Sequence, residues 1–285
     1  MIIIGSRYGR LGNRLFLFSH FISNSIEYDY KLLNPAFQEY GHYFDLQSER
    51  TEFRNIVAFD NSCRSKTFLE VVRFIERITR RNLSLPNFEI IRHWKEDSFD
   101  LNNERFISMA RKKIVLTYGW LFRDYPSLTK HQNSIRKIFT PQRETMENVH
   151  NLISTARENC DILIGVHLRK GDYRHFMDGT YYYTDENYLD IMKRMAAIFD
   201  SHRIGFLLCS DENVNVEFFE AHSLNFNVGT RHEVEDMYAF SQCDYLIGPP
   251  STYTMWASFY GRIPLYQISN PDKTPQLNDF KICTS

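Results

Sequence analysis

The second half of the chain alternates short apolar runs with amphipathic segments, and this order constrains the fold more than any other feature. The runs Ile162–Leu168 and Ile204–Cys209 are apolar enough for strands that are buried on both faces. Weaker runs follow at 224–228, 245–248 and 263–268, with helical spacing after Thr184 and at 214–221, 234–241 and 253–260. A repeated strand–helix order predicts an α/β fold with a parallel sheet.

The first half follows this order less regularly. The apolar run Ile2–Ile4 predicts a strand. The helical spacing of the apolar residues Leu15, Phe18 and Ile22 predicts a helix after it. Residues 64–113 read as helical and basic, with 12 Lys and Arg against 7 Asp and Glu, and Ile114–Trp120 predicts another strand. Pro141 interrupts the pattern. We therefore predict two domains, 1–142 and 143–285, of which the first is irregular and rich in helix.

Composition narrows the class of function. Lys and Arg (34) nearly balance Asp and Glu (35), so the net charge of -1 argues against a nucleic-acid-binding protein. The five cysteines lie at least 34 positions apart, a spacing that favours a reducing compartment over a disulfide framework. The sequence contains no apolar run of about 18 residues. We expect a cytoplasmic protein without a transmembrane segment, for which peripheral membrane association stays possible.

The segment His167–Tyr173 lies at the carboxyl end of the first buried strand of the second half and is the strongest candidate site. Ligands of open α/β sheets bind beyond the carboxyl ends of the strands. The fork of Arg169 suits bidentate phosphate binding, and Lys170 adds a point charge. Asp172 could orient Arg169 or accept a proton, and we favour orientation because a carboxylate beside two cations is a weak base. The alternatives are a solvated strand end for the cations, a loop cap for Asp172 and a buried strand residue for His167.

Other polar residues stand at the ends of predicted strands or at helix starts. Ser251 and Thr252 precede a helix, where backbone N–H groups could bind phosphate, although plain capping explains them as well. Ser210-Asp211 ends another strand, and Asp236 could be an ordinary acid in the first turn of a helix. Gly5, Gly9 and Gly12 let a backbone loop approach a ligand, although a tight turn is the commoner cause, and Asn13 could be a helix N-cap.

The sequence offers little for metal or hydrolytic chemistry. No two aspartates stand two positions apart, H-E-x-x-H is absent, and no G-x-S-x-G elbow occurs. We therefore expect no metal and no other cofactor.

Several blocks of the sequence resemble one family. His167–Asp172 is similar to the H-x-R-R-x-D motif of fucosyltransferases that use GDP-fucose, and Gly9–Phe16 resembles the G-G-L-G-N-Q-x-F opening of the α-1,2-fucosyltransferases. Asp236–Cys243 with Ser251–Ala257 resembles the D-x-x-x-M-x-x-C and S-T-F-S-W-W blocks, and Phe206–Asp211 resembles F-x-x-F-S-D. Four departures point to a divergent member: Lys170 for arginine, Arg14 for glutamine, Pro249-Pro250 before the serine block, and no tryptophan after Asp211.

The resemblance implies a GT-B-like fold, with two Rossmann-like domains facing a cleft. It implies an inverting, metal-independent transfer of fucose from GDP-fucose to a glycan hydroxyl, so that the partners are a nucleotide sugar and a glycan acceptor. The implied catalytic residues are Arg169, Asp172 and His167. The implied donor-binding residues are Arg169, Lys170, Ser210, Asp211, Asp236, Ser251, Thr252 and Tyr253. The implied acceptor-side loop holds Gly9, Gly12, Asn13 and Arg14. A transferase for another nucleotide sugar and a non-catalytic glycan- or nucleotide-binding relative are the alternatives.

Overall fold

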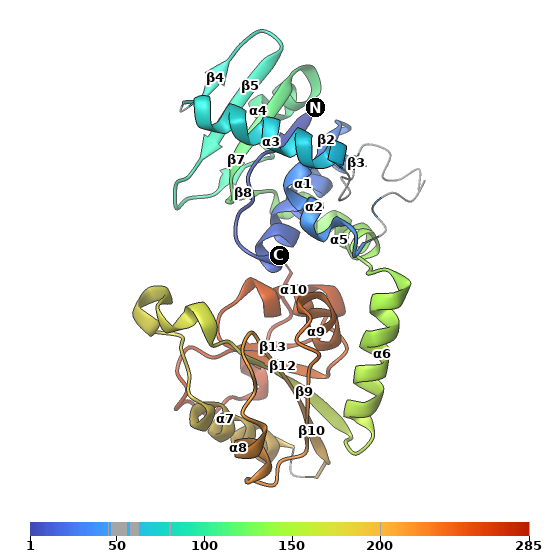
Figure 1. Cartoon of the computed structure of the whole chain (residues 1–285), viewed down its shortest axis with the longest axis vertical. Helices are drawn as coiled ribbons and strands as arrows, with labels where there is room; N and C mark the ends of the chain where they lie inside the picture. Colours follow the sequence, from blue (N-terminus) through green and yellow to red (C-terminus); the bar gives the residue numbers. More distant parts are fainter. Residues whose placement is uncertain (45, 47–55, 58–62, 80, 200, 285) are drawn as a thin grey trace. The chain divides into compact units, whose positions relative to one another are not determined.

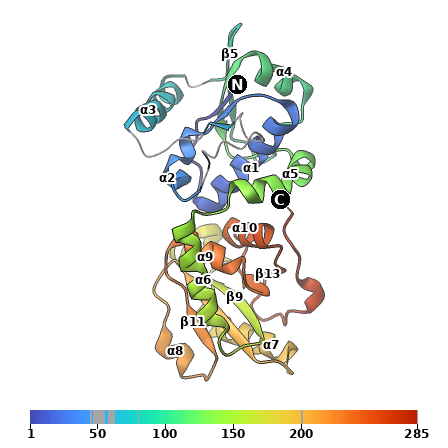
Figure 2. The same ribbon diagram turned by 90° about the vertical axis from the view of Figure 1, so that its right-hand side faces the viewer.

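A computed structural model describes residues 1–44, 46, 56–57, 63–79, 81–199 and 201–284 (Figures 1 and 2). The chain divides into two compact units, Met1–Gln142 and Arg143–Thr284. Each unit has its own parallel sheet with helices packed on it, so the predicted α/β class is confirmed. Among the described residues, no helix has both the length and the apolar character needed to cross a membrane.

The unit 143–284 contains a five-stranded sheet in the order β11-β10-β9-β12-β13, with all neighbours parallel. The strands are β9 (Ile162–Leu168), β10 (Ile204–Ser210), β11 (Phe226–Val228), β12 (Tyr245–Gly248) and β13 (Leu265–Gln267). The helices are α6 (Arg143–Arg157), α7 (Asp185–Ile198), α8 (Val216–Glu220), α9 (Glu233–Phe240) and α10 (Thr252–Gly261). The strand order reverses between β9 and β12, and such a reversal is the usual place for a ligand crevice.

Successive side chains of β9 face two different helix layers. Val166 and Leu168 pack with Tyr188 of α7 in a fully buried cluster. On the opposite face the sheet approaches α9 so closely that a Cβ at Gly165 would lie 2.6 Å from the ring of Phe240. Figures 1 and 2 show α7 and α8 on one side of this sheet and α6 and α9 on the other. The apolar run of β9 is therefore covered on both faces, as its sequence predicts.

The unit 1–142 contains a six-stranded sheet in the order β3-β2-β1-β7-β5-β4, parallel except between β4 and β5. The strands are β1 (Ile2–Ile4), β2 (Leu32–Leu33), β3 (Ile56–Val57), β4 (Leu83–Ser84), β5 (Phe88–His93) and β7 (Ile114–Gly119), while β6 (Phe99–Asp100) pairs separately with β8 (Phe122–Arg123). The α-helices are α1 (Leu11–Tyr28), α2 (Gln38–Gly41), α3 (Cys63–Ile78), α4 (Glu104–Lys112) and α5 (Tyr125–Ile138). The strand order reverses here between β1 and β7.

A buried polar cluster joins α1 to α5. Asp124 caps α5 by accepting the backbone N–H of Ser127 (2.9 Å), and it also accepts Asn24 Nδ2 of α1 (2.7 Å). The backbone N–H of Asp124 donates to Nδ1 of His20 (3.0 Å). Burial, with a smaller effect of Arg123, lowers the pKa of His20 to about 3. His20 therefore holds the cluster together as a neutral acceptor.

The segment 64–113 differs from its prediction. It is helical in α3 and α4, but β5 is a six-residue strand between β7 and β4. The polar residues of β5 find partners far away in the sequence: Glu89 pairs with Lys113 (2.9 Å), and the guanidinium of Arg92 lies 4.9 Å from the ring centre of Tyr118. These distant partners make a charged segment compatible with a strand. The first unit is accordingly more regular than predicted.

Candidate active site

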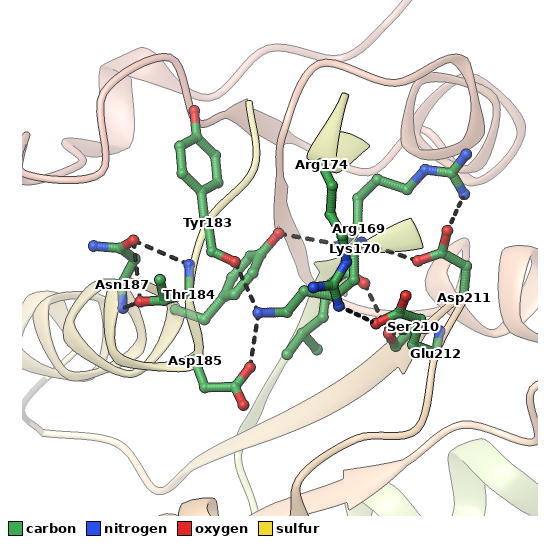
Figure 3. Close-up of polar contacts among 12 residues, drawn as sticks. Arg169, Lys170, Arg174, Tyr183, Thr184, Asp185, Asn187, Ser210, Asp211 and Glu212 are labelled. Carbon is green, nitrogen blue, oxygen red and sulfur yellow. Dashed lines mark hydrogen bonds and ion pairs between the residues drawn. The ribbon is translucent and has the colours of Figure 1, made fainter. Parts of the chain in front are cut away.

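Arg169 directly follows β9, at the point where the strand order of the second sheet reverses. Its Nη2 lies 2.6 Å from Oδ1 of Asp172. Its Nη1 lies 3.0 Å from Oδ2 of Asp211, which follows β10 (Figure 3). The guanidinium also lies over the ring of Tyr173, 5.1 Å from its centre. Its Nε is buried and has no hydrogen-bond partner within the part of the chain that the structure describes. The guanidinium is thus fixed at the strand end from three sides.

The backbone around Arg169 is equally constrained. Its N–H lies 3.1 Å from the hydroxyl of Tyr188 in α7, and the N–H of Lys170 donates to Oδ1 of Asp211 (2.9 Å). Gly171 permits this turn, because a Cβ there would lie 2.6 Å from Oδ2 of Asp211. One carboxylate, Asp211, therefore holds both the side chain of Arg169 and the backbone beside it.

Lys170 points to the start of α7. Its ammonium lies 2.8 Å from Oδ1 of Asp185 and donates to the carbonyl of Tyr183 (2.7 Å), as Figure 3 shows. The ring of Tyr188 lies 5.1 Å from it, and Lys170 is 9% exposed. The charge of Lys170 is compensated by the polypeptide itself. The two cations of the motif thus have different surroundings, and Arg169 is the one between two strand ends.

Tyr173 connects this turn to the loop before α10. Its hydroxyl donates to the carbonyl of Pro250 (2.6 Å). Ser251 is the N-cap of α10, since its Oγ accepts the N–H of Tyr253 (3.2 Å), and Thr252 is the first residue of the helix. The structure therefore brings Arg169 and the start of α10 to the same edge of the sheet. Tyr173 ends the candidate segment His167–Tyr173, but its sequence position alone indicated no role for it.

His167 lies inside the unit. It is 3% exposed, and its ring lies against Tyr253 and Phe240, at 5.0 and 6.1 Å between ring centres. Burial and the nearby Arg169 lower the pKa of His167 to about 3. The imidazole is therefore neutral at ordinary pH. Nδ1 has no hydrogen-bond partner among the residues described.

Ser210 and Asp236 shape loops at the same edge. Oγ of Ser210 donates to the carbonyl of Leu168 (2.9 Å). Asp236 accepts the backbone N–H groups of Thr230 (2.7 Å) and Arg231 (3.1 Å), which organise the loop after β11. Burial raises the pKa of the Asp236 carboxyl. Both residues thus have structural contacts, and Asp236 also lies in the first turn of α9, which is the alternative that the sequence left open for it.

The glycine loop belongs to the other unit. Gly9 has a φ of +64°, and a Cβ there would lie 2.2 Å from Nδ2 of Asn13. The N-cap of α1 is Arg10, so the reading of Asn13 as an N-cap is wrong. Arg14 donates to the carbonyl of Gly9 (3.1 Å) and pairs with Glu39 (2.7 Å). Gly12 is buried in the first turn of α1. The loop is therefore held by the side chains that follow it.

Comparison with known proteins shows which family the chain belongs to. The model of glycosyl transferase family 11 matches residues 66–272, well over half of the chain. A search of curated proteins finds no match.

Among the described residues, no three His, Cys, Asp or Glu side chains gather in a group that could hold a metal ion.

Solved fucosyltransferases share the fold. A mutant of FUT1 from Arabidopsis thaliana in complex with GDP is 13% identical, with a TM-score of 0.62 over 98% of this chain and 72% of that chain. The α-1,6-fucosyltransferase NodZ soaked with GDP-fucose is 14% identical, with a TM-score of 0.58 over 95% and 97% of the two chains. A structure of the fucosyltransferase NodZ from Bradyrhizobium is 14% identical, with a TM-score of 0.61 over 95% and 96%. POFUT1 in complex with GDP is 14% identical, with a TM-score of 0.56 over 93% and 97%. The GT-B-like fold and the resemblance to fucosyltransferases are thereby confirmed, and the chain is a glycosyltransferase that belongs to glycosyl transferase family 11.

Proposed function

We propose that this chain transfers fucose from GDP-fucose to a hydroxyl of a glycan, with inversion and an α-1,2 linkage. The similarity to proteins solved with GDP or soaked with GDP-fucose supports the donor. The linkage rests on the sequence resemblance alone, because the similar NodZ is an α-1,6-fucosyltransferase.

The observation that carries the proposal is the fixed guanidinium of Arg169. When the bond between the sugar and GDP breaks, negative charge develops on the departing phosphate, and a cation already held in place stabilises that charge without reorganisation. Asp172 is 53% exposed in its side chain and Asp211 only 16%. A diphosphate would therefore approach from the open side of Asp172, which orients the guanidinium for it, while Asp211 keeps its hold on Nη1.

The start of α10 supplies the second half of this phosphate site. Ser251 caps the N–H of Tyr253, so the other N–H groups of the first helical turn would bind the phosphate, and the positive end of the helix dipole favours an anion. Arg169 and α10 together make a divalent metal unnecessary for the leaving group, so we propose transfer without metal or other cofactor. Lys170 positions this turn through α7, and His167 supports the site from inside the unit as a neutral side chain packed against Tyr253.

The remaining roles follow the resemblance. We propose that Ser210, Asp211, Asp236, Ser251, Thr252 and Tyr253 surround the donor. The loop with Gly9, Gly12, Asn13 and Arg14 would belong to the acceptor side.

A transfer screen tests the proposal. GDP-, UDP- and dTDP-sugars are incubated with a panel of glycans, with and without EDTA, and products are detected by mass. We expect a gain of one deoxyhexose from GDP-fucose, unchanged by EDTA, with the opposite anomeric configuration to the donor by NMR. Arg169→Ala should abolish the product. Arg174→Ala is the matched control, because Arg174 lies in the same loop, is 49% exposed and pairs with Glu212 (2.8 Å).

Three results would contradict the proposal. Transfer from a UDP- or dTDP-sugar alone would show another donor. Loss of transfer in EDTA, restored by manganese or magnesium, would show a metal requirement. Folded protein that binds GDP but neither transfers nor hydrolyses any donor would be a non-catalytic relative.

A further inference from the structure

Three aromatic side chains gather at the carboxyl edge of the first sheet. Trp94 directly follows β5, Trp120 directly follows β7, and Tyr8 lies in the loop after β1. These strands are neighbours in the order β1-β7-β5 and run parallel, so their carboxyl ends lie at one edge. We call Tyr8, Trp94 and Trp120 the aromatic platform. The fold needs none of the three to form its core, since none is buried.

The rings form a stepped surface. Tyr8 stacks on Trp120 with ring centres 5.1 Å apart and planes 5° apart. Trp94 stands 6.4 Å from Tyr8 at an angle of 43°. Trp94 is 53% exposed, an uncommon state for the largest apolar side chain, while Tyr8 and Trp120 are half-buried. The guanidinium of Arg123 lies 5.6 Å from the ring centre of Trp120 and supports it.

The backbone at the ends of β5 and β7, which carries the platform, has little room to change its conformation. Gly119 has a φ of +132°, and a Cβ there would lie 2.1 Å from the carbonyl oxygen of His93. Only a glycine lets the ends of β5 and β7 approach so closely, and Trp94 and Trp120 directly follow these two paired strand ends. The N–H of Gly119 donates to Oγ of Ser6 (3.1 Å), which fixes the loop that carries Tyr8. The platform is therefore preformed rather than a chance exposure of flexible side chains.

We propose that the aromatic platform binds a sugar ring of the glycan acceptor, an inference that rests on the proposed function. The face of an aromatic ring is electronegative, and the C–H groups of a pyranose, polarised by neighbouring oxygens, pack on it. A flat nucleobase would instead favour a slot between two parallel rings. Here the two parallel rings, Tyr8 and Trp120, already contact each other, and Trp94 is tilted. The stepped surface therefore fits the puckered face of a sugar.

Tryptophan fluorescence reads this site directly. The chain has three tryptophans, and Trp256 is fully buried in the other unit, so Trp94 and Trp120 supply the response to added ligand. We titrate the protein with lactose, cellotetraose and maltotetraose, and with any acceptor that the transfer screen finds. We expect a saturable change for at least one glycan, and no such change with GDP alone.

Variants separate this inference from the proposed function. Trp94→Ala should weaken glycan binding, measured by calorimetry, and raise the acceptor KM at least about tenfold, while the GDP-induced melting shift and the hydrolysis of GDP-fucose stay unchanged. Trp94→Phe should recover most of the binding because it restores a flat face. Phe74→Ala is the control, since Phe74 is 59% exposed on α3 of the same unit.

Each outcome of these experiments supports or overturns the aromatic platform as an acceptor site. An acceptor KM within about twofold of the wild type in Trp94→Ala overturns the platform as an acceptor site. Loss of the GDP-induced shift in that variant shows that the rings bind the nucleotide instead. If no donor supports transfer, the proposed function fails, and the glycan titration alone decides. A saturable response that Trp94→Ala removes then sustains sugar binding, and its absence in the wild type overturns it.

Discussion

Among single residues, Arg169 is the one on which the proposed chemistry depends most. Arg169→Lys keeps the positive charge, but an ammonium cannot contact Asp211 and a phosphate as the guanidinium fork does. We expect kcat to fall roughly 30- to 900-fold, which corresponds to about 2–4 kcal/mol of lost transition-state stabilisation. Steady-state kinetics with Arg174→Lys as control measure the effect. Activity of Arg169→Ala within about tenfold of the wild type would remove Arg169 from the mechanism.

The two carboxylates that contact Arg169 should have different effects when each is changed to an amide. Asp172 is half-exposed, and an exposed ion pair contributes only ~0–1 kcal/mol, so Asp172→Asn should leave the melting temperature nearly unchanged while turnover falls about tenfold. The side chain of Asp211 is only 16% exposed, and it also accepts the N–H of Lys170. Asp211→Asn should therefore lower both turnover and the melting temperature, by roughly 3–9 °C. Thermal melts beside kinetics distinguish the two. Equal loss of stability in both variants would make Asp172 a structural residue.

At the scale of elements, the sequence predicted those helices and strands whose pattern lies within their own residues, and missed those that depend on contacts with other segments. β9 has the predicted bounds, Ile162–Leu168, because an apolar run covered on both faces is visible in the run itself. Thr184 caps α7 through a capping box with Asn187, directly before the helical spacing that the sequence shows. β5 was missed because the partners of Glu89 and Arg92 lie on other segments.

The candidate site shows the same limit. The end of β9 predicted a cation at the sheet edge, and Arg169 lies there. Its contact with Asp211 depends on the pairing of β9 with β10, in which Leu168 stands opposite Ser210. The direction of Lys170 toward Asp185 depends on where α7 docks. Neither the register nor the docking of a helix is encoded within the motif, so the sequence could not separate the roles of the two cations.

Two elements, β9 and α1, each bury a neutral histidine, and this predicts a loss of stability in mild acid. The pKa values of His167 and His20 are both lowered to about 3 in the folded chain. Between pH 6.5 and 3 the unfolded chain binds more protons than the folded one, so stability falls as the pH falls. Each histidine should cost about 2 kcal/mol at pH 5 relative to pH 7.5.

Thermal melts at the two pH values test this prediction. His167→Gln removes the titrating group in the second unit and should reduce the acid-induced drop in that unit's melting temperature. His202→Gln is the control, because His202 is exposed. An equal drop in the wild type and in His167→Gln would show that other groups cause the acid sensitivity.

For the whole molecule, the proposed donor predicts which nucleotides stabilise the fold. A ligand that binds only the folded chain stabilises it by about 2.7 kcal/mol at a concentration of 100 times its Kd. UDP shares the diphosphate that Arg169 and α10 would bind, whereas the base pocket would distinguish guanine from uracil. Free GDP should therefore raise the melting temperature more than UDP at equal concentration.

Variants show how much of the rise in melting temperature comes from contacts with the phosphates and how much from contacts with the base. Arg169→Ala should reduce the shifts with both nucleotides, because it removes the shared phosphate contact. Asp236→Asn should reduce mainly the excess of GDP over UDP, since Asp236 organises the loop after β11 rather than the phosphate site. Glu217→Gln, an exposed change on α8, should alter neither shift. Equal shifts with GDP and UDP in the wild type would contradict a guanine pocket, and the family's fold would then serve a different nucleotide sugar.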